Sequence, residues 1–276
     1  MNILFGEPQE HGLNYCSVFL KELAGEVPRN ITTIETNGTV TEADKILASS
    51  NPALFYHVGH GSYYSFTVEC RTAYINSITG ERLSNFKDKI VHLLSCETGM
   101  RLGSALVNRG AKAYLGYNDV FYYGICDETK PDPAPHTPSD NYQDFYSFID
   151  CDVEAERRLV VKGGTVKQAV EDSQAKFEEY IDKYETGEWK DRWIAPYMVR
   201  FLRHNKDCQV TYGNINASVT EGAPVVTDEY SDPLHLLITI VEKSRPKIPV
   251  AALENLVSSA AYNIMNIAPG LKLGNK

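Results

Sequence analysis

Short apolar runs alternate with amphipathic stretches along the first 120 or so residues. The runs at residues 2–5, 31–35, 53–58, 90–94 and 111–117 have the length and bounding turn residues that predict buried strands. Residues 13–24 and 100–108 carry apolar side chains at helical spacing, and Thr41 followed by Asp44 resembles a capping box that opens another helix. Apolar strands separated by amphipathic helices favour an α/β fold with a mainly parallel central sheet flanked by helices, a three-layer sandwich.

The second part of the chain is less regular. Residues 124–144 contain four prolines and many acids, which predicts a long surface loop. Residues 165–184 predict a helix, and residues 197–202 and 209–212 predict a strand pair with a turn at His204. Beyond residue 213 the pattern weakens, with a candidate strand at 236–241 and a candidate helix at 250–267. We therefore predict a main domain over residues 1–213 and an extension or small appended subdomain over 214–276.

Composition narrows the class of protein. Hydrophobic residues make up 43% of the 276 residues, so a sizeable core is available, and the net charge of −9 disfavours nucleic-acid binding. The amino-terminal residues lack a secretory pattern, and no apolar run is long enough to cross a bilayer. Together with the absence of CxxC pairs, this favours a cytoplasmic protein without a metal, a cofactor or a membrane partner. The six cysteines stand at positions 16, 70, 96, 126, 151 and 208.

Two reactive side chains follow predicted strands directly. His60 lies between Gly59 and Gly61 after one strand, and Cys96 follows another. In parallel sheets, chemistry gathers at the carboxyl ends of the strands, so we expect the two loop tips to lie side by side. Cys96 stands where a strand is predicted to give way to a helix, whose amides would lower the pKa of the thiol. A thiol, an imidazole and amides that stabilise an oxyanion are the requirements of a cysteine peptidase.

These segments resemble a known clan of peptidases. Gly59-His60-Gly61-Ser62 after an apolar strand is similar to the His-Gly motif of the clan of caspases, gingipains, clostripain, legumain and separase. The run from Leu93 through Cys96, and the following segment to residue 116, resemble the cysteine segment of its gingipain-like and CHAT-type members. The resemblance covers roughly residues 1–213 and implies a caspase-like fold.

The resemblance also implies roles for individual residues. Cys96 would be the nucleophile and His60 the general acid/base of a dyad, with the amides of Gly61 and Cys96 as the oxyanion hole. The substrate would be a polypeptide, and the loop after residue 117, with Asp119 followed by Asp127 and Glu128, would contribute to the selection of a basic residue before the cut bond. Tyr63, with other tyrosines near the predicted rim, is a candidate lining of the peptide cleft.

Members of the clan commonly mature by cutting themselves in a loop or by docking to an activating partner protein. The Pro-rich acidic loop around Lys130 is a candidate site for such a cut. His57 and His92 lie inside predicted strands, which favours satisfied core histidines over a shared metal site.

Two other functions fit the same pattern. The first is a caspase-like module without activity that binds other proteins, and the second is a flavodoxin-like binder of small molecules in which Cys96 is a buried thiol. No GxSxG, P-loop or GxGxxG motif follows a predicted strand, which argues against a serine hydrolase and a nucleotide-binding protein.

Overall fold

The computed structural model describes residues 2–6, 16–29, 31–36, 39–69, 72–123 and 140–219. The chain divides into two units, Met1–Thr227 and Asp228–Lys276, and all described residues belong to the first. The candidate strand at 236–241 and the candidate helix at 250–267 lie outside the described residues. The prediction of an extension or a small subdomain also concerns mainly residues from 220 onward, which are not described.

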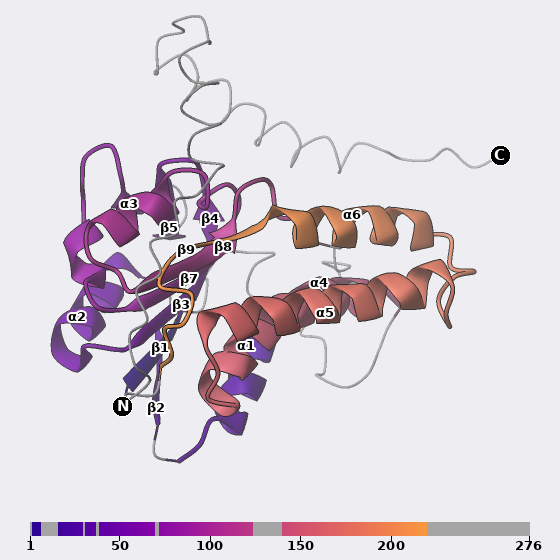
Figure 1. Ribbon diagram of the computed structural model, residues 1–276, viewed down its shortest axis with the longest axis horizontal. Coiled ribbons are helices and arrows are strands. Elements are labelled where there is room, and N and C mark those ends of the chain that lie inside the picture. The colour runs from indigo at the N-terminus through magenta and orange to yellow at the C-terminus, as the bar shows by residue number, and fades with distance from the viewer. Residues whose placement is uncertain are drawn as a thin grey trace, which may run out of the picture. The chain divides into compact units, whose positions relative to one another are not determined.

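The centre of the molecule is a mixed six-stranded sheet with the order β2-β1-β3-β7-β8-β9 (Figure 1). The first five strands of that order run parallel, and β9 pairs antiparallel with β8 at one edge. The predicted α/β class and mostly parallel sheet are therefore confirmed. The strands are β1 (Asn2–Gly6), β2 (Thr32–Thr36), β3 (Leu54–Val58), β7 (Ile90–Leu94), β8 (Ala113–Tyr117) and β9 (Gln209–Gly213).

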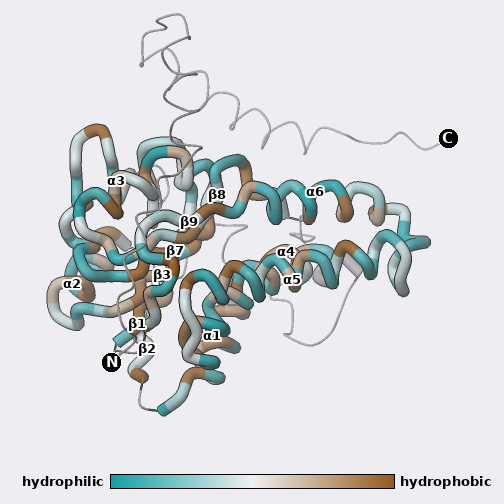
Figure 2. Tube along the Cα trace, in the orientation of Figure 1, coloured by the Kyte–Doolittle hydropathy of each residue, from teal (hydrophilic) through white to brown (hydrophobic). Residues whose placement is uncertain are grey.

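Helices cover both faces of this sheet, because alternate side chains of each buried strand point to opposite sides. One face packs on α1, α4, α5 and α6, and the other packs on α2, α3 and the short helix η1. The apolar positions follow the sheet while polar positions mark the outer helix surfaces (Figure 2). The helices are α1 (Cys16–Glu26), α2 (Val40–Ser50), η1 (Leu83–Phe86), α3 (Leu102–Asn108), α4 (Asp140–Glu156), η2 (Arg157–Val161), α5 (Val166–Glu185) and α6 (Ala195–Cys208).

A second, three-stranded antiparallel sheet follows β3 directly. It consists of β4 (His60–Gly61), β5 (Ser65–Glu69) and β6 (Thr72–Asn76) in that order. Phe66 and Ile75 from this sheet are fully buried in the same core as α2 and α3. This small sheet was absent from the sequence prediction, and it fixes the backbone on which His60 stands.

Helix starts depend on capping side chains, and one of the two predicted starts is displaced. The side chain of Thr39, rather than that of Thr41, caps α2 by accepting a hydrogen bond from the amide of Glu42. Thr165 caps α5 in a complete capping box with Gln168. The predicted helix at residues 165–184 is therefore confirmed, while the cap of α2 lies two residues earlier than predicted.

The segment at residues 197–202 is helical, so the prediction of a strand there was wrong. It lies within α6, whose buried positions Ala195, Met198, Val199 and Leu202 follow the spacing of a helix face. Packing of α6 along α5 overrides the strand preference of the tyrosine, valine and phenylalanine in this segment (Figure 1). The second member of the predicted pair, at 209–212, is the edge strand β9.

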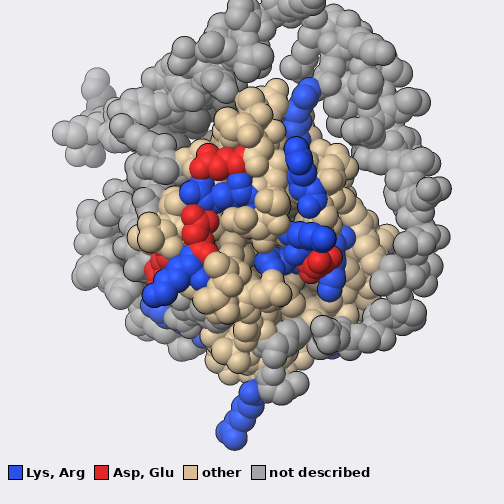
Figure 3. All heavy atoms as spheres, turned by 90° about the vertical axis from the view of Figure 1, so that its left-hand side faces the viewer, with Lys and Arg blue, Asp and Glu red and all other residues tan. Residues whose placement is uncertain are grey.

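The overall negative charge is not spread evenly. On the face shown in Figure 3, which includes α2 and α3, lysine and arginine side chains outnumber acidic ones. Lys87, Arg109 and Lys112 are among the exposed cations of this part of the chain. The face seen in this view is therefore basic although the net charge of the whole chain is −9.

Candidate active site

The pairing of β3 with β7 determines where His60 and Cys96 lie. Val58 is opposite Leu94 in this parallel pair, and the amide of Gly59 still donates to the carbonyl oxygen of Leu94 at 3.2 Å. Past these residues, His60 pairs with Thr67 of β5 in the small sheet, and Cys96 enters the turn that leads to α3. The two loops therefore leave adjacent strands at the same end of the sheet, as predicted.

Gly61 makes the contact between the two loops. A Cβ atom at this position would lie 2.3 Å from the carbonyl oxygen of Cys96 and 3.0 Å from Cβ of Ser95. Only a residue without a side chain can bring its backbone this close. That the sulfur of Cys96 and the imidazole of His60 face one substrate stays a prediction, as do the oxyanion-hole roles of the Gly61 and Cys96 amides.

Cys96 does not stand at a helix start, so the expectation of a lowered thiol pKa was wrong. Helix α3 begins only at Leu102, and turns occupy the segment between. Burial raises the pKa of the Cys96 thiol, a hydrogen bond with the backbone of Phe121 opposes this, and the charges of Glu97 and Asp119 raise it further. The resting residue is therefore a neutral thiol in a partly buried position.

A hydrogen-bond network holds the turn that carries Cys96. The hydroxyl of Ser95 lies 2.8 Å from that of Thr98, and the hydroxyl of Tyr114 donates to Thr98 at 2.8 Å. All three side chains are buried. Glu97, between them, adopts a left-handed backbone conformation with φ of 60°, which is unusual outside glycine. The turn is thus fixed by buried polar contacts and keeps a strained residue next to the thiol.

Two carboxylates lie beside Cys96. The amide of Glu97 donates to the carbonyl oxygen of Asp119 at 3.0 Å, which joins the turn to the segment after β8. Burial and the charge of Asp119 raise the pKa of Glu97. Asp119 itself is exposed, and its carboxylate accepts a hydrogen bond from the amide of Val120. Sequence reasoning singled out Asp119 and missed Glu97, although it directly follows the cysteine.

Tyrosines line the surroundings of these loops. Tyr63 is half-buried, and its carbonyl oxygen accepts a hydrogen bond from the amide of Leu102 at the start of α3. Tyr122 and Tyr123 are exposed, with Tyr122 stacked on Phe201 of α6. Tyr63 therefore lies near the candidate site through its backbone contact, while its predicted role in substrate binding stays a prediction.

His57 and His92 are fully buried, as predicted, and they lie in the two different cores. His57 stacks on Phe55 and approaches Phe66, and its Nδ1 lies 2.6 Å from the carbonyl oxygen of Val58. Burial lowers the pKa of His57 to about 4, so this imidazole is neutral near pH 7. Because the two imidazoles lie on opposite faces of the sheet, one metal ion cannot bind both His57 and His92.

His92 belongs to a buried polar network between β7 and α4. Its two ring nitrogens lie 3.1 Å from a carboxylate oxygen of Asp152 and 2.7 Å from one of Glu156. The hydroxyls of Tyr56 and Tyr117 donate to Asp152 at 2.6 Å each. Burial alone would lower the pKa of His92, but the two carboxylates outweigh it and raise the pKa to about 10. His92 is thus a buried cation that links the sheet to α4, and no sequence motif indicated these partners.

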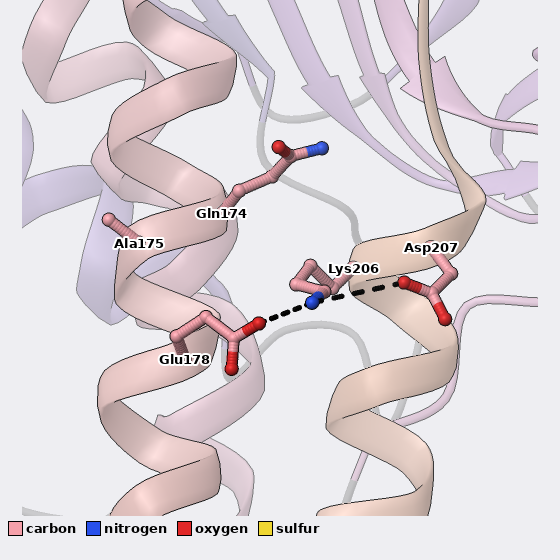
Figure 4. Close-up of a pocket in the computed structure, with 5 residues that line it drawn as sticks. All are labelled: Gln174, Ala175, Glu178, Lys206 and Asp207. Atoms are coloured by element: carbon pink, nitrogen blue, oxygen red, sulfur yellow. Dashed lines mark hydrogen bonds and ion pairs between the residues drawn. The ribbon is translucent and has the colours of Figure 1, made fainter.

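A hollow of about 500 Å³ lies elsewhere, between α5 and α6. Its lining includes the ion pair between Lys206 and Glu178, and Asp207 lies 4.0 Å from the same ammonium group (Figure 4). Neither His60 nor Cys96 lines it. This hollow is therefore separate from the candidate active site, and its charged side chains are already paired.

Comparison with known proteins does not assign this chain to a family. No protein-family model matches the chain, and no curated protein matches its sequence. Within the described residues, no helix is both long and apolar enough to cross a membrane. Several predicted features lie outside the described residues: the self-cleavage site around Lys130, the candidate specificity residues Asp127 and Glu128, and the thiols of Cys70 and Cys126.

Proposed function

We propose that this protein is a caspase-like cysteine endopeptidase that uses Cys96 and His60 as a catalytic dyad. The observation that carries the proposal is the close approach of Gly61 to the backbone of Cys96, because it places the His-Gly loop and the cysteine loop at one edge of a parallel sheet. The mostly parallel sheet, closed by an antiparallel edge strand, supports the same assignment.

The raised pKa of Cys96 determines how the first step would run. Because the thiol is neutral at rest, His60 takes its proton as the sulfur attacks the carbonyl carbon of the peptide bond. The tetrahedral intermediate then collapses to a thioester, and the imidazolium gives the proton to the leaving amine. Water, deprotonated by His60, hydrolyses the thioester and returns the thiol and a carboxylic acid.

The two carboxylates beside Cys96 suggest the substrate class. The charges of Glu97 and Asp119 both act on the Cys96 thiol, and burial together with the charge of Asp119 raises the pKa of Glu97. A lysine or arginine side chain before the cut bond would relieve this repulsion and gain a charge-assisted hydrogen bond. We therefore expect cleavage after basic residues.

The proposal is tested by profiling the full chain and five single variants against a peptide library. Cys96→Ala should abolish cleavage, whereas Cys16→Ala, which removes a buried thiol at the start of α1, should keep it. His60→Ala should lower turnover by two or more orders of magnitude, the range of general acid–base catalysis. Glu97→Gln and Asp119→Asn should weaken the preference for basic residues.

Labelling of the folded protein with an acyloxymethyl ketone separates the alternatives. Stoichiometric labelling that disappears in Cys96→Ala supports the peptidase. Turnover unchanged by Cys96→Ala would overturn the mechanism. An unlabelled Cys96 in folded protein without turnover would instead favour a caspase-like interaction module or a flavodoxin-like binder.

A further inference from the structure

A second group of reactive side chains lies where α6 ends. One potential ligand atom each from Asp119, His204 and Cys208 lies within 4.8 Å of the other two. Sγ of Cys208 is 3.4 Å from Nε2 of His204, and the same nitrogen is 2.9 Å from the carbonyl oxygen of Val120. Three potential ligands, from carboxylate, imidazole and thiol groups, therefore lie together, and a backbone carbonyl lies beside the imidazole.

The fold builds this cluster from two segments that are far apart in the sequence. His204 and Cys208 are four residues apart in α6, so they lie on one face of its last turn. Tyr117 pairs with Gln209, and the amide of Asn118 donates to the carbonyl oxygen of Cys208 at 2.9 Å. This antiparallel pairing places the segment after β8 beside the end of the helix.

We propose that Asp119, His204 and Cys208 bind a divalent transition metal ion, with zinc as the best match. A thiolate and an imidazole select zinc over calcium or magnesium, which prefer oxygen ligands. Three protein ligands leave one tetrahedral position, which the carbonyl oxygen of Val120 or a water molecule fills. The carboxyl end of α6 carries partial negative charge, which also favours a cation.

The separations already resemble a coordination sphere. Ligands at about 2.0–2.3 Å from a tetrahedral zinc ion lie roughly 3.3–3.8 Å from one another, so the sulfur–nitrogen separation is close to its final value. Coordination through Nε2 requires the tautomer of His204 that carries its proton on Nδ1. The ring then gives up its hydrogen bond to Val120, whose carbonyl oxygen turns to the metal.

Accessibility and protonation fit binding from solution. Asp119 is exposed and His204 is half-buried, so the cluster opens to solvent on the side of the carboxylate. Burial and the charges of Asp119 and Asp207 raise the pKa of the Cys208 thiol to about 11. Zinc binding near pH 7 therefore displaces one proton from this thiol.

The experiment is zinc titration of the full chain, freed of metal by a chelator, in a Cys96→Ser background that removes the proposed nucleophile as a ligand. We expect one equivalent to bind and to release about one proton, seen as a dependence of the calorimetric enthalpy on the ionisation enthalpy of the buffer. Cobalt in place of zinc should give a thiolate-to-metal charge-transfer band.

Three variants and one matched control locate the site. Cys208→Ser, His204→Gln and Asp119→Asn should each weaken zinc binding tenfold or more, and Cys208→Ser should also lose the charge-transfer band. Asp207→Asn removes the neighbouring carboxylate, which is largely exposed and outside the cluster, and should leave affinity within about twofold. Circular dichroism of the metal-free variants checks that each one folds.

The outcomes decide the proposal independently of the peptidase. Absence of saturable binding would overturn it, and so would equal affinity in His204→Gln and the parent. Because His204 is only half-buried, its variant carries the test if Cys208→Ser does not fold. Asp119 serves both proposals, so His204→Gln and Cys208→Ser report on the metal alone.

Discussion

At the scale of single residues, Gly61 decides whether the candidate site forms. Its backbone lies against the carbonyl oxygen of Cys96, a main-chain atom, and against the short, buried side chains of Thr98 and Ser95. Any larger residue must push the two loops apart. The geometry of the site therefore depends on a position that has no chemistry of its own.

Gly61→Ala should destabilise the fold by about 1–3 kcal/mol, the usual cost of overpacking, and should lower the rate of Cys96 labelling. Gly25→Ala is the matched control, because a Cβ there meets nothing within 4 Å and the residue lies in α1. That variant should stabilise the protein by up to about 1 kcal/mol. Urea unfolding measures both effects, and a Gly61→Ala variant as stable as the parent would contradict the close approach.

The reactivity of Cys96 should keep rising with pH up to higher pH values than the reactivity of an ordinary thiol does. Because its pKa is raised from 9.0, the rate of alkylation by iodoacetamide should still increase above pH 9. The rate is followed by mass spectrometry of the peptide that contains Cys96. A plateau already near pH 7 would indicate a thiolate–imidazolium pair and contradict the buried, neutral thiol.

At the scale of elements, the histidines in neighbouring strands β3 and β7 predict opposite pH effects on stability. His57 has its pKa lowered from 6.5 to about 4, so the unfolded state binds more protons between these values. The free energy of unfolding should therefore fall as the pH drops through this window, by about 3 kcal/mol in total. His57→Gln should flatten this acid limb in urea titrations at several pH values.

His92 has the reverse effect, because its pKa is raised from 6.5 to about 10 in the folded protein. Its contribution is fully present below pH 6.5 and is lost as the pH rises toward 10. His92→Gln should flatten the alkaline limb while lowering stability overall, since it leaves Asp152 and Glu156 buried without their cation. An alkaline limb unchanged by this variant would show that His92 is neutral.

Helices α4 and α6 also show the limits of reasoning from the sequence. The strands of the parallel sheet were predictable because each is a short apolar run or, in β2, a run of β-branched residues, and these runs placed His60 and Cys96 at strand ends. Helix α4 was missed because Asp152 and Glu156 occupy core positions, where they pair with His92 and interrupt the apolar pattern. A buried ion network depends on tertiary partners, which periodicity cannot reveal.

The incorrect strand prediction within α6 concealed the proposed metal site. With residues 197–202 predicted as a strand and His204 in a turn, the four-residue spacing of His204 and Cys208 had no meaning. As a helix, that spacing aligns both side chains. The positions of His60 and Cys96 followed from the chain pattern, whereas the contributions of Glu97, His204 and Cys208 required the packing of distant segments.

At the scale of the whole molecule, the main unit extends past the last strand. Ala217 and Val219 are buried in the core, and the amides of Val166 and Lys167 at the start of α5 donate to carbonyl groups of residues 217 and 215. These contacts close the amino-terminal end of α5 after β9 has already completed the sheet.

A chain that stops after Gly213 should consequently be less stable than one that stops after Thr227. Loss of the two buried side chains predicts a difference of roughly 2–4 kcal/mol, visible as a lower melting temperature in calorimetry. The longer fragment is the control, since it keeps the whole first unit. Equal melting temperatures for the two fragments would show that residues 214–219 contribute nothing to the core.

The sheet separates two hydrophobic cores with no buried residue in common among the described residues, one toward α4 and α5 and the other toward α2 and α3. Phe148 on the first side and Phe86 on the second can therefore be varied independently, and their energetic effects should add. An engineer could redesign either layer in a separate library without revisiting the other. The backbone of the sheet therefore keeps the packing energies of the two side-chain layers nearly independent of each other.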